Sequence, residues 1–239
     1  MIKDTLKKIL KLIPIPLSRN HKYDLLTKKI INNLQISSNC IDVGCFKGEI
    51  LDLMKNAAPE GYHFGIEPLP NQFKFLSNKY SHTKNCTILN LAASNSTGVS
   101  DFNYVMSNPS YSGLKKRDYD NPREKDTTIR VKTDLLDNVI PKDISIDLIK
   151  IDVEGAELQV LEGAIEIIEK NKPIIIFEHG IGASNHYGTT PAKLFDFFSK
   201  VSMKVSTLDN YLTNKKPLTK SEFEKQYYDR LNYYFIAHK

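Results

Sequence analysis

The stretch CIDVGCFKG, residues 40–48, decides how the rest of the chain is interpreted. A short apolar run ends at Asp42 and Val43, Gly44 and Gly48 lie four positions apart, and helix-forming residues follow. This order is typical of a strand, a tight turn and the opening of a helix. Glycines in such a turn let bare backbone come close to a ligand at the N-terminus of the helix.

The composition is that of an ordinary globular protein. The 239 residues are 41% hydrophobic and 26% charged, and this length fits one α/β domain with additions. The net charge of +5 comes from 33 basic and 28 acidic residues. A nucleic-acid partner is not expected, because such proteins carry a denser basic stripe. Three cysteines, no secretory signal and no long apolar run lead us to expect a cytoplasmic protein without disulfides.

The sequence divides into an N-terminal helical extension, residues 1–37, and a main domain, residues 38–239. A helix is predicted over residues 2–13, where apolar residues repeat at helical spacing and lysines fill much of the other face. We favour packing of this helix on its own domain. The alternative is peripheral contact with an anionic membrane, here the inner membrane surface. A second helix is predicted over residues 23–34.

Strand and helix patterns then alternate along the main domain. This order predicts right-handed crossovers and a largely parallel sheet. Residues 106–126 are polar and rich in turn residues, so we predict a long excursion from the sheet, which is often functional. The predicted strands are 39–43, 62–66, 86–91, 98–105, 128–132, 146–153, 173–177, 201–208 and 233–238, and the predicted helices are 49–55, 71–80, 156–170 and 191–200.

The glycine turn discriminates between two cofactor classes. Dinucleotide sites and S-adenosylmethionine sites both place an acid after the second strand, as Glu67 is placed here, to bind ribose hydroxyls. A dinucleotide site also favours a middle glycine, which is absent between Gly44 and Gly48. In addition, Asp42 would repel a phosphate but would attract an ammonium or sulfonium group. The turn therefore favours S-adenosylmethionine over a nicotinamide dinucleotide.

A second motif ends another apolar strand, in residues 146–157. Ligands of open parallel sheets bind outside the carboxyl ends of the strands. Four acids are predicted at such ends, and packing alone explains them poorly because unpaired buried carboxylates are costly. Capping and solvation would account for Glu154 and Glu157 at the start of a helix. For Lys150 we expect a stem that covers apolar surface and a head that reaches water. The four acids are Asp42, Glu67, Asp152 and Glu178.

Taken together, the motifs resemble the FkbM family of S-adenosylmethionine-dependent methyltransferases from about residue 39 to 200. The resemblance implies a Rossmann-like class I methyltransferase fold: a mostly parallel seven-stranded sheet with an antiparallel last strand and helices on both faces. It also implies O-methylation of hydroxyl groups. The segment Cys45-Phe46-Lys47 departs from the small and polar residues common in the family. The similar motifs are Asp42-Val-Gly-x-x-x-Gly48, Glu67-Pro68, Asn90-Leu-Ala-Ala-Ser94 with Gly98, Leu136-Asp137, Ile149-Lys-Ile-Asp-Val-Glu-Gly-Ala-Glu157 and Phe177-Glu-His179.

The same resemblance implies a role for individual residues. For the cofactor, these are Asp42, Gly44 and Gly48 at the methionine part, Glu67 at the ribose, and Asn90 and Ala92 near the adenine. The catalytic candidates are Asp152, where methyl group and acceptor meet, with Glu178 and His179; His186 is a further candidate base. Asp152, Glu178 and His179 would suit a divalent cation, but their spacing is not a metal motif, so no metal is included in the prediction.

The predicted function is O-methylation of a sugar, glycoconjugate or secondary metabolite. The alternatives are N-methylation of a small molecule, or a non-catalytic module of the same fold that binds the cofactor or docks on a membrane. Tyr111, Ser112 and Lys115 in the long excursion are candidate contacts to the acceptor. The acceptor itself and the oligomeric state have no signature in the sequence.

Overall fold

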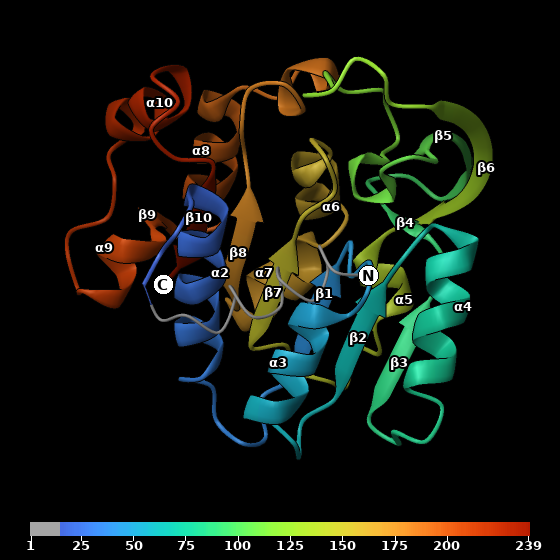
Figure 1. Ribbon diagram of the computed structural model, residues 1–239. Coiled ribbons are helices and arrows are strands. Elements are labelled where there is room, and N and C mark those ends of the chain that lie inside the picture. Colours follow the sequence, from blue (N-terminus) through green and yellow to red (C-terminus); the bar gives the residue numbers. More distant parts are fainter. Residues whose placement is uncertain (1–14) are drawn as a thin grey trace.

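The computed structural model describes residues 15–239, so the helix predicted over residues 2–13 lies outside the described residues. The main sheet has seven strands in the order β3-β2-β1-β7-β8-β10-β9 (Figure 1). Only its last strand in sequence, β10, runs antiparallel to its neighbours, as predicted. The strands are Cys40–Val43 (β1), His63–Ile66 (β2), Cys86–Leu89 (β3), Leu148–Ile151 (β7), Ile174–Glu178 (β8), Lys204–Thr207 (β9) and Tyr234–His238 (β10).

A smaller sheet lies beside the main one, at the upper right of Figure 1, with the order β4-β6-β5. Gly98–Val105 (β5) and Asp126–Asp134 (β6) pair antiparallel, and the short strand Ala92–Ala93 (β4) pairs with β6. The long excursion, which includes the 3-10 turn Pro109–Tyr111 (η1), connects β5 to β6. The excursion therefore starts and ends on a hairpin that fixes its position.

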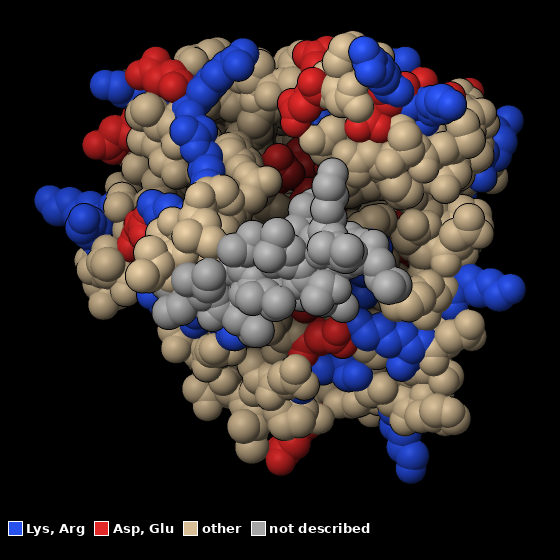
Figure 2. All heavy atoms as spheres, viewed as in Figure 1, with Lys and Arg blue, Asp and Glu red and all other residues tan. Residues whose placement is uncertain are grey.

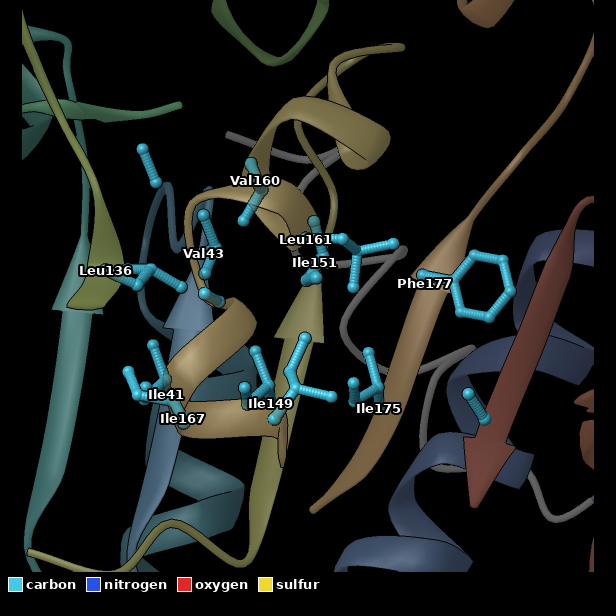
Figure 3. Packing of buried hydrophobic residues seen from close by; sticks show 14 of the residues in the cluster. Ile41, Val43, Leu136, Ile149, Ile151, Val160, Leu161, Ile167, Ile175 and Phe177 are labelled. Atoms are coloured by element: carbon cyan, nitrogen blue, oxygen red, sulfur yellow. The ribbon is translucent and has the colours of Figure 1, made fainter. Parts of the chain in front are cut away.

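Helices cover both faces of the main sheet, since alternate strand residues point to opposite faces. On one face, residues such as Ile41, Ile149 and Ile175 pack against α5 to α8 and α10 (Figure 3). On the other, Cys40, Leu148 and Ile176 pack against α2, α3, α4 and α9. The helices are Arg19–Ile31 (α2), Glu49–Ala57 (α3), Pro70–Lys79 (α4), Leu136–Val139 (α5), Glu157–Glu162 (α6), Ile165–Asn171 (α7), Pro191–Lys200 (α8), Leu208–Leu212 (α9) and Lys220–Tyr228 (α10), with a 3-10 turn at Ser184–Tyr187 (η2).

The prediction of one helix over residues 156–170 is wrong, because the segment forms two helices that break at Gly163. A Cβ atom at Gly163 would lie 2.0 Å from the backbone oxygen of Ser94, so the break is where two backbones touch. Asp137 then caps the second helix, since its carboxylate accepts from the N–H groups of Glu166 and Ile167 at 2.9 and 3.0 Å. Within residues 15–239 we find no helix with the length and apolar character needed to cross a membrane.

Candidate functional site

The turn after β1 and the loop after β7 are in backbone contact. Gly44 has a φ of +77°, and a Cβ atom there would lie 2.0 Å from the backbone oxygen of Asp152. Gly48 has a φ of +72° and is the N-cap of α3. Only glycine adopts such angles without strain and leaves such space free. The two glycines therefore let the carboxyl ends of β1 and β7, which are paired strands, meet at one point.

Glu67 follows β2 and faces the same turn. Its carboxylate accepts hydrogen bonds from the backbone N–H groups of Phe46 at 2.8 Å and Leu69 at 2.9 Å. Burial raises the pKa of Glu67 to about 7, although these two bonds work in the other direction. Asn90 stabilises the backbone at Glu67 and Pro68, since its amide donates hydrogen bonds to their backbone oxygens at 2.8 and 3.1 Å.

Glu67 lines a pocket with mainly apolar walls, here called the Glu67 pocket. Gly44, Phe46 and Asp152 belong to its lining, together with the apolar side chains Ile66, Leu69, Leu91, Ala92, Phe102 and Leu114. Ala92 lines this pocket, whereas Asn90 is not part of its lining. A flat apolar ring and a group with hydroxyls would both find partners here.

Asp42 lines a second, adjoining pocket of about 200 Å³, here called the Asp42 pocket. Asp42 is almost fully buried, and neither of its carboxylate oxygens has a hydrogen-bond partner among the described residues. Burial raises its pKa to about 6, and the nearby Lys150 ammonium limits this rise. Because an unpartnered buried carboxylate is costly, the pocket is suited to a cationic ligand.

Asp152 follows β7 and has several partners. Its carboxylate accepts from the Lys150 ammonium at 3.0 Å and from the Tyr234 hydroxyl, and it shares a hydrogen bond with Glu178. Burial works against the ionised form, but the Lys150 charge and these bonds outweigh it and lower the pKa of Asp152 to about 2. In Glu178, burial and then the Asp152 charge raise the pKa well above its ordinary value. The two pKa values therefore shift in opposite directions: the surroundings favour the ionised form of Asp152 and the protonated form of Glu178.

Two sequence expectations for this motif are wrong. The head of Lys150 does not reach water, because the side chain is buried and its ammonium pairs with Asp152. Burial alone would lower the pKa of Lys150, but the neighbouring carboxylates outweigh it and the pKa is raised. Glu157 is not a solvated acid either: it is buried and accepts from the backbone N–H groups of Val153 and Gly155 at 3.3 and 3.0 Å. Glu157 therefore orders the loop that carries Asp152.

A third hollow, about 670 Å³ in volume, opens beside Asp152 and is here called the tyrosine cleft. Figure 2 shows charges of both signs on this face and acidic atoms recessed in a hollow near its middle. Tyrosines contribute much of the lining, with arginines, asparagines and acids between them. Those tyrosines are Tyr23, Tyr111, Tyr227, Tyr233 and Tyr234.

The long excursion forms one wall of the cleft. Arg117 lies over the ring of Tyr111, 4.7 Å from its centroid, and pairs with Glu154 in the loop after β7. Lys115 does not line the cleft, because its backbone N–H and ammonium bond to the Tyr187 hydroxyl and the His186 oxygen at 2.7 and 3.1 Å. Tyr111 lines the tyrosine cleft and Ser112 lines the Glu67 pocket, so the excursion contributes to both.

The histidine candidates lie outside the three hollows. His179 has no exposed surface, its ring stacks on Tyr227 with 4.5 Å between centroids, and burial lowers its pKa to about 3. We therefore withdraw His179 as a catalytic candidate, since it can neither reach a substrate nor take a proton at neutral pH. His186 lies 3.1 Å from Asp118 and helps to hold the excursion.

The structure brings together residues that the sequence did not single out. Tyr234 and Arg117 join the site although they lie far from the β7 motif in sequence. Tyr234 begins β10, which pairs with β8, and its register opposite Glu178 explains why it reaches Asp152. Only the antiparallel pairing implied by the family resemblance could have suggested this position.

Comparisons with known proteins identify the family of the chain. Residues 42–216 match the model of the methyltransferase FkbM domain. Among solved structures, the chain is similar to methyltransferase FkbM from Methylobacillus flagellatus KT, with 17% identity and a TM-score of 0.51 over 87% of this chain and 45% of that one. It is also similar to precorrin-6y C5,15-methyltransferase from Geobacter metallireducens GS-15, with 13% identity and a TM-score of 0.42 over 77% and 72%.

These structural similarities concern the fold, and the chain spans less than half of the Methylobacillus structure. The comparison with curated protein sequences gave no match. The family match covers most of the chain and includes the turn after β1, Glu67 and the loop after β7. The chain belongs to the FkbM family of S-adenosylmethionine-dependent methyltransferases.

Proposed function

We propose that this protein transfers a methyl group from S-adenosylmethionine to a hydroxyl group of a sugar, a glycoconjugate or a secondary metabolite. The observation that carries the proposal is the position of Asp152. This residue lines the Glu67 pocket, the Asp42 pocket and the tyrosine cleft. A carboxylate at the junction of all three hollows is placed to contact an acceptor hydroxyl next to the donor.

The two pockets fit the parts of the donor. The unpartnered oxygens of Asp42 suit the ammonium group of the methionine part. The Glu67 carboxylate suits ribose hydroxyls, and the apolar walls around Leu91 and Ala92 suit the adenine. When bound, S-adenosylmethionine supplies a methyl group that its sulfonium has already activated.

The residues of the chain then need only to orient the acceptor and accept its proton. Asp152 is ionised, so it accepts a hydrogen bond from the hydroxyl and holds the oxygen in position. Lys150 and Tyr234 keep Asp152 fixed. As the methyl group is transferred, the hydroxyl proton passes to the Asp152 carboxylate, the ionised acceptor at the junction, and from there to solvent in the tyrosine cleft.

The tyrosine cleft suits an acceptor with many hydroxyl groups. Tyrosine rings offer apolar faces to the flat side of a sugar, and their hydroxyls offer polar edges. Asn20 and Asn232 add amide groups, and Arg19 and Arg230 add donors in a planar geometry. Many of these groups already bond to one another, as the Tyr23 hydroxyl does to Asn232 and the Tyr233 hydroxyl to Asn20. The cleft is therefore a preformed polar surface, and a purely apolar acceptor would take it out of water at a cost in free energy.

A divalent cation is a separate question. Asp152, Glu154 and Glu178 have carboxylate oxygens within 4.8 Å of one another, a group found among the described residues. Two of the three already face a protein cation, since Asp152 pairs with Lys150 and Glu154 with Arg117. We leave a metal out of the proposal because these ion pairs already balance the charges.

Calorimetry on the full chain tests the donor first. S-adenosylmethionine should bind with measurable heat, and NAD should not. Methyl transfer from a labelled donor is then measured against a panel of sugars, glycolipids and polyketide-type alcohols, with amines as the comparison. Label in an alcohol supports the proposal, label only in amines replaces it with N-methylation, and an absence of donor binding overturns the enzyme assignment.

A further inference from the structure

Phe46 occupies a strained position that glycine would adopt at lower cost. Its φ is +46°, in the left-handed region, between Gly44 and Gly48. Bulky residues adopt this region at a cost of about 1–2 kcal/mol. The conformation directs the Phe46 N–H to the Glu67 carboxylate at 2.8 Å, but a glycine or asparagine N–H would serve as well. The backbone conformation therefore accounts for the turn, but it gives no reason for an aromatic side chain at position 46.

The position of Phe46 relative to the two donor pockets indicates what its side chain does. Phe46 lines both the Glu67 pocket and the Asp42 pocket. In S-adenosylmethionine the sulfonium links the ribose to the methionine chain. If the ribose is at Glu67 and the ammonium at Asp42, the sulfonium lies where the pockets join. Five residues line both pockets, and Phe46 is the aromatic one: Gly44, Phe46, Ser110, Asp152 and Glu154.

The ring of Phe46 already lies near one cation. The Lys47 ammonium lies 5.2 Å from its centroid, within the distance at which an aromatic ring attracts a cation. The carboxylates at the junction are committed to protein cations, Asp152 to Lys150 and Glu154 to Arg117. An aromatic ring is neutral, so burying it beside a sulfonium costs less desolvation than burying a carboxylate there. Its face still attracts the positive charge.

From this arrangement we infer that Phe46 is a specificity-determining residue that lets the site distinguish the charged methyl donor from its uncharged product. The inference rests on the proposed function, because it requires S-adenosylmethionine in the two pockets. S-adenosylhomocysteine lacks the methyl group and the positive charge but keeps the adenosine and the amino acid. A ring at the junction favours the sulfonium over the neutral thioether, and so favours release of product after each transfer.

The test compares affinities of the full chain for S-adenosylmethionine and S-adenosylhomocysteine by calorimetry. Phe46→Leu keeps an apolar side chain and removes the ring, so the preference for the charged compound should fall by about 2- to 20-fold, the range expected of a cation–π contact. Phe46→Tyr keeps the ring and should keep the preference. Lys47→Met removes a competing positive charge and should raise the preference by a smaller factor. Thermal unfolding checks that each variant is folded.

Each outcome decides one point. If Phe46→Leu weakens both compounds equally, the side chain only covers the pocket and the inference is overturned. The same holds if Phe46→Tyr loses the preference to the same extent as Phe46→Leu, or if Lys47→Met lowers it. If the unmodified protein binds neither compound, the proposed function fails instead. The two failures are thus distinguishable.

Discussion

Asp42 and Asp152 are the same residue type at the same edge of one sheet, at the ends of neighbouring strands, yet their surroundings shift their pKa values in opposite directions. Asp42 has no hydrogen-bond partner for its carboxylate among the described residues, and burial raises its pKa to about 6. Asp152 is bonded to Lys150, Tyr234 and Glu178, and its pKa is lowered to about 2. The difference lies in the hydrogen-bond donors and positive charge that the protein places beside each carboxylate.

Lys150 accounts for much of this contrast. On β7 it is in register with Asp42 on β1, but its ammonium donates to Asp152 at 3.0 Å. A buried ammonium that has one close partner stabilises that partner most. Asp152 thus has a directly bonded countercharge within the protein, whereas Asp42 feels the Lys150 charge only from a distance. In the proposed function, Asp152 serves the transfer step and Asp42 binds the cationic donor.

The largest expected effect follows from removing the charge of Asp152. Asp152→Asn should lower methyl transfer by about 10²–10⁴-fold, the usual contribution of a positioned proton acceptor. Donor affinity should change little, because Asp42 and Glu67 remain. Single-turnover transfer of labelled methyl to the acceptor found in the panel measures the first quantity, and calorimetry the second. Asp101→Asn is the matched control, since Asp101 is exposed and pairs only loosely with Arg130. A fully active Asp152→Asn would remove Asp152 from the mechanism.

The contact between the β1 turn and the β7 loop can be broken at Gly44. Gly44→Ala should lower the free energy of unfolding by about 2–4 kcal/mol, because the new Cβ adds a backbone clash to left-handed strain. Gly188→Ala separates the two causes, as Gly188 has a φ of +66° and open space around its Cβ position. It should cost only about 1 kcal/mol. Equal losses in urea unfolding would show that strain alone matters.

Substitution of Glu67 tests the proposed binding of the methyl donor. Glu67→Ala should weaken S-adenosylmethionine binding by about 1–3 kcal/mol, since a charged hydrogen-bond acceptor is lost and two backbone N–H groups lose their partner. Glu67→Gln keeps one acceptor oxygen and should lose less. Calorimetry at one pH compares the three proteins. Unchanged affinity in Glu67→Ala would refute a ribose role.

The smallest effect is a pH dependence of donor binding to which Asp42 contributes together with Glu67, whose pKa burial raises to about 7. A bound cation favours the ionised form, so donor binding releases the proton of Asp42 and affinity rises with pH. With a pKa of about 6, affinity should increase about tenfold from pH 5 to pH 7. Asp42→Asn should bind more weakly and lose this part of the dependence. Because Asp152 is ionised throughout this range, its substitution should leave the slope unchanged. A slope that is equally steep in Asp42→Asn would assign the titration to another group, and the same measurement on Glu67→Gln shows whether that group is Glu67.

Local pattern predicted much of the fold. The strands of the sheet and most helices follow from alternation and turn residues, and each predicted strand has a counterpart within a few residues. The helices α9 and α10 were missed because their segment is lysine-rich and has a weak apolar pattern. Gly163 is a weak point of the predicted helix over residues 156–170 from sequence alone, but the break there depends on contact with Ser94, which is distant in sequence.

Some features of the site could likewise be predicted from sequence, and others could not. The acids at the carboxyl ends of the strands could be predicted because the ends of parallel strands gather at one edge. His179 could not be judged from sequence, since its neighbours Phe223 and Tyr227 come from α10. Two partners of Asp152 also come from distant segments, Glu178 at the end of β8 and Tyr234 on β10.

By itself, the sequence determined which residues end the strands, where the chain turns, and hence that carboxylates gather around a glycine turn. These properties depend on neighbours in sequence and on the geometry of parallel strands. Only the tertiary structure decided in which direction the pKa of each carboxylate shifts, that Lys150 is buried, and that Phe46 lies between two pockets. Ionisation and burial depend on every group within a few ångströms, and those groups come from strands and loops that the chain brings together only when it folds.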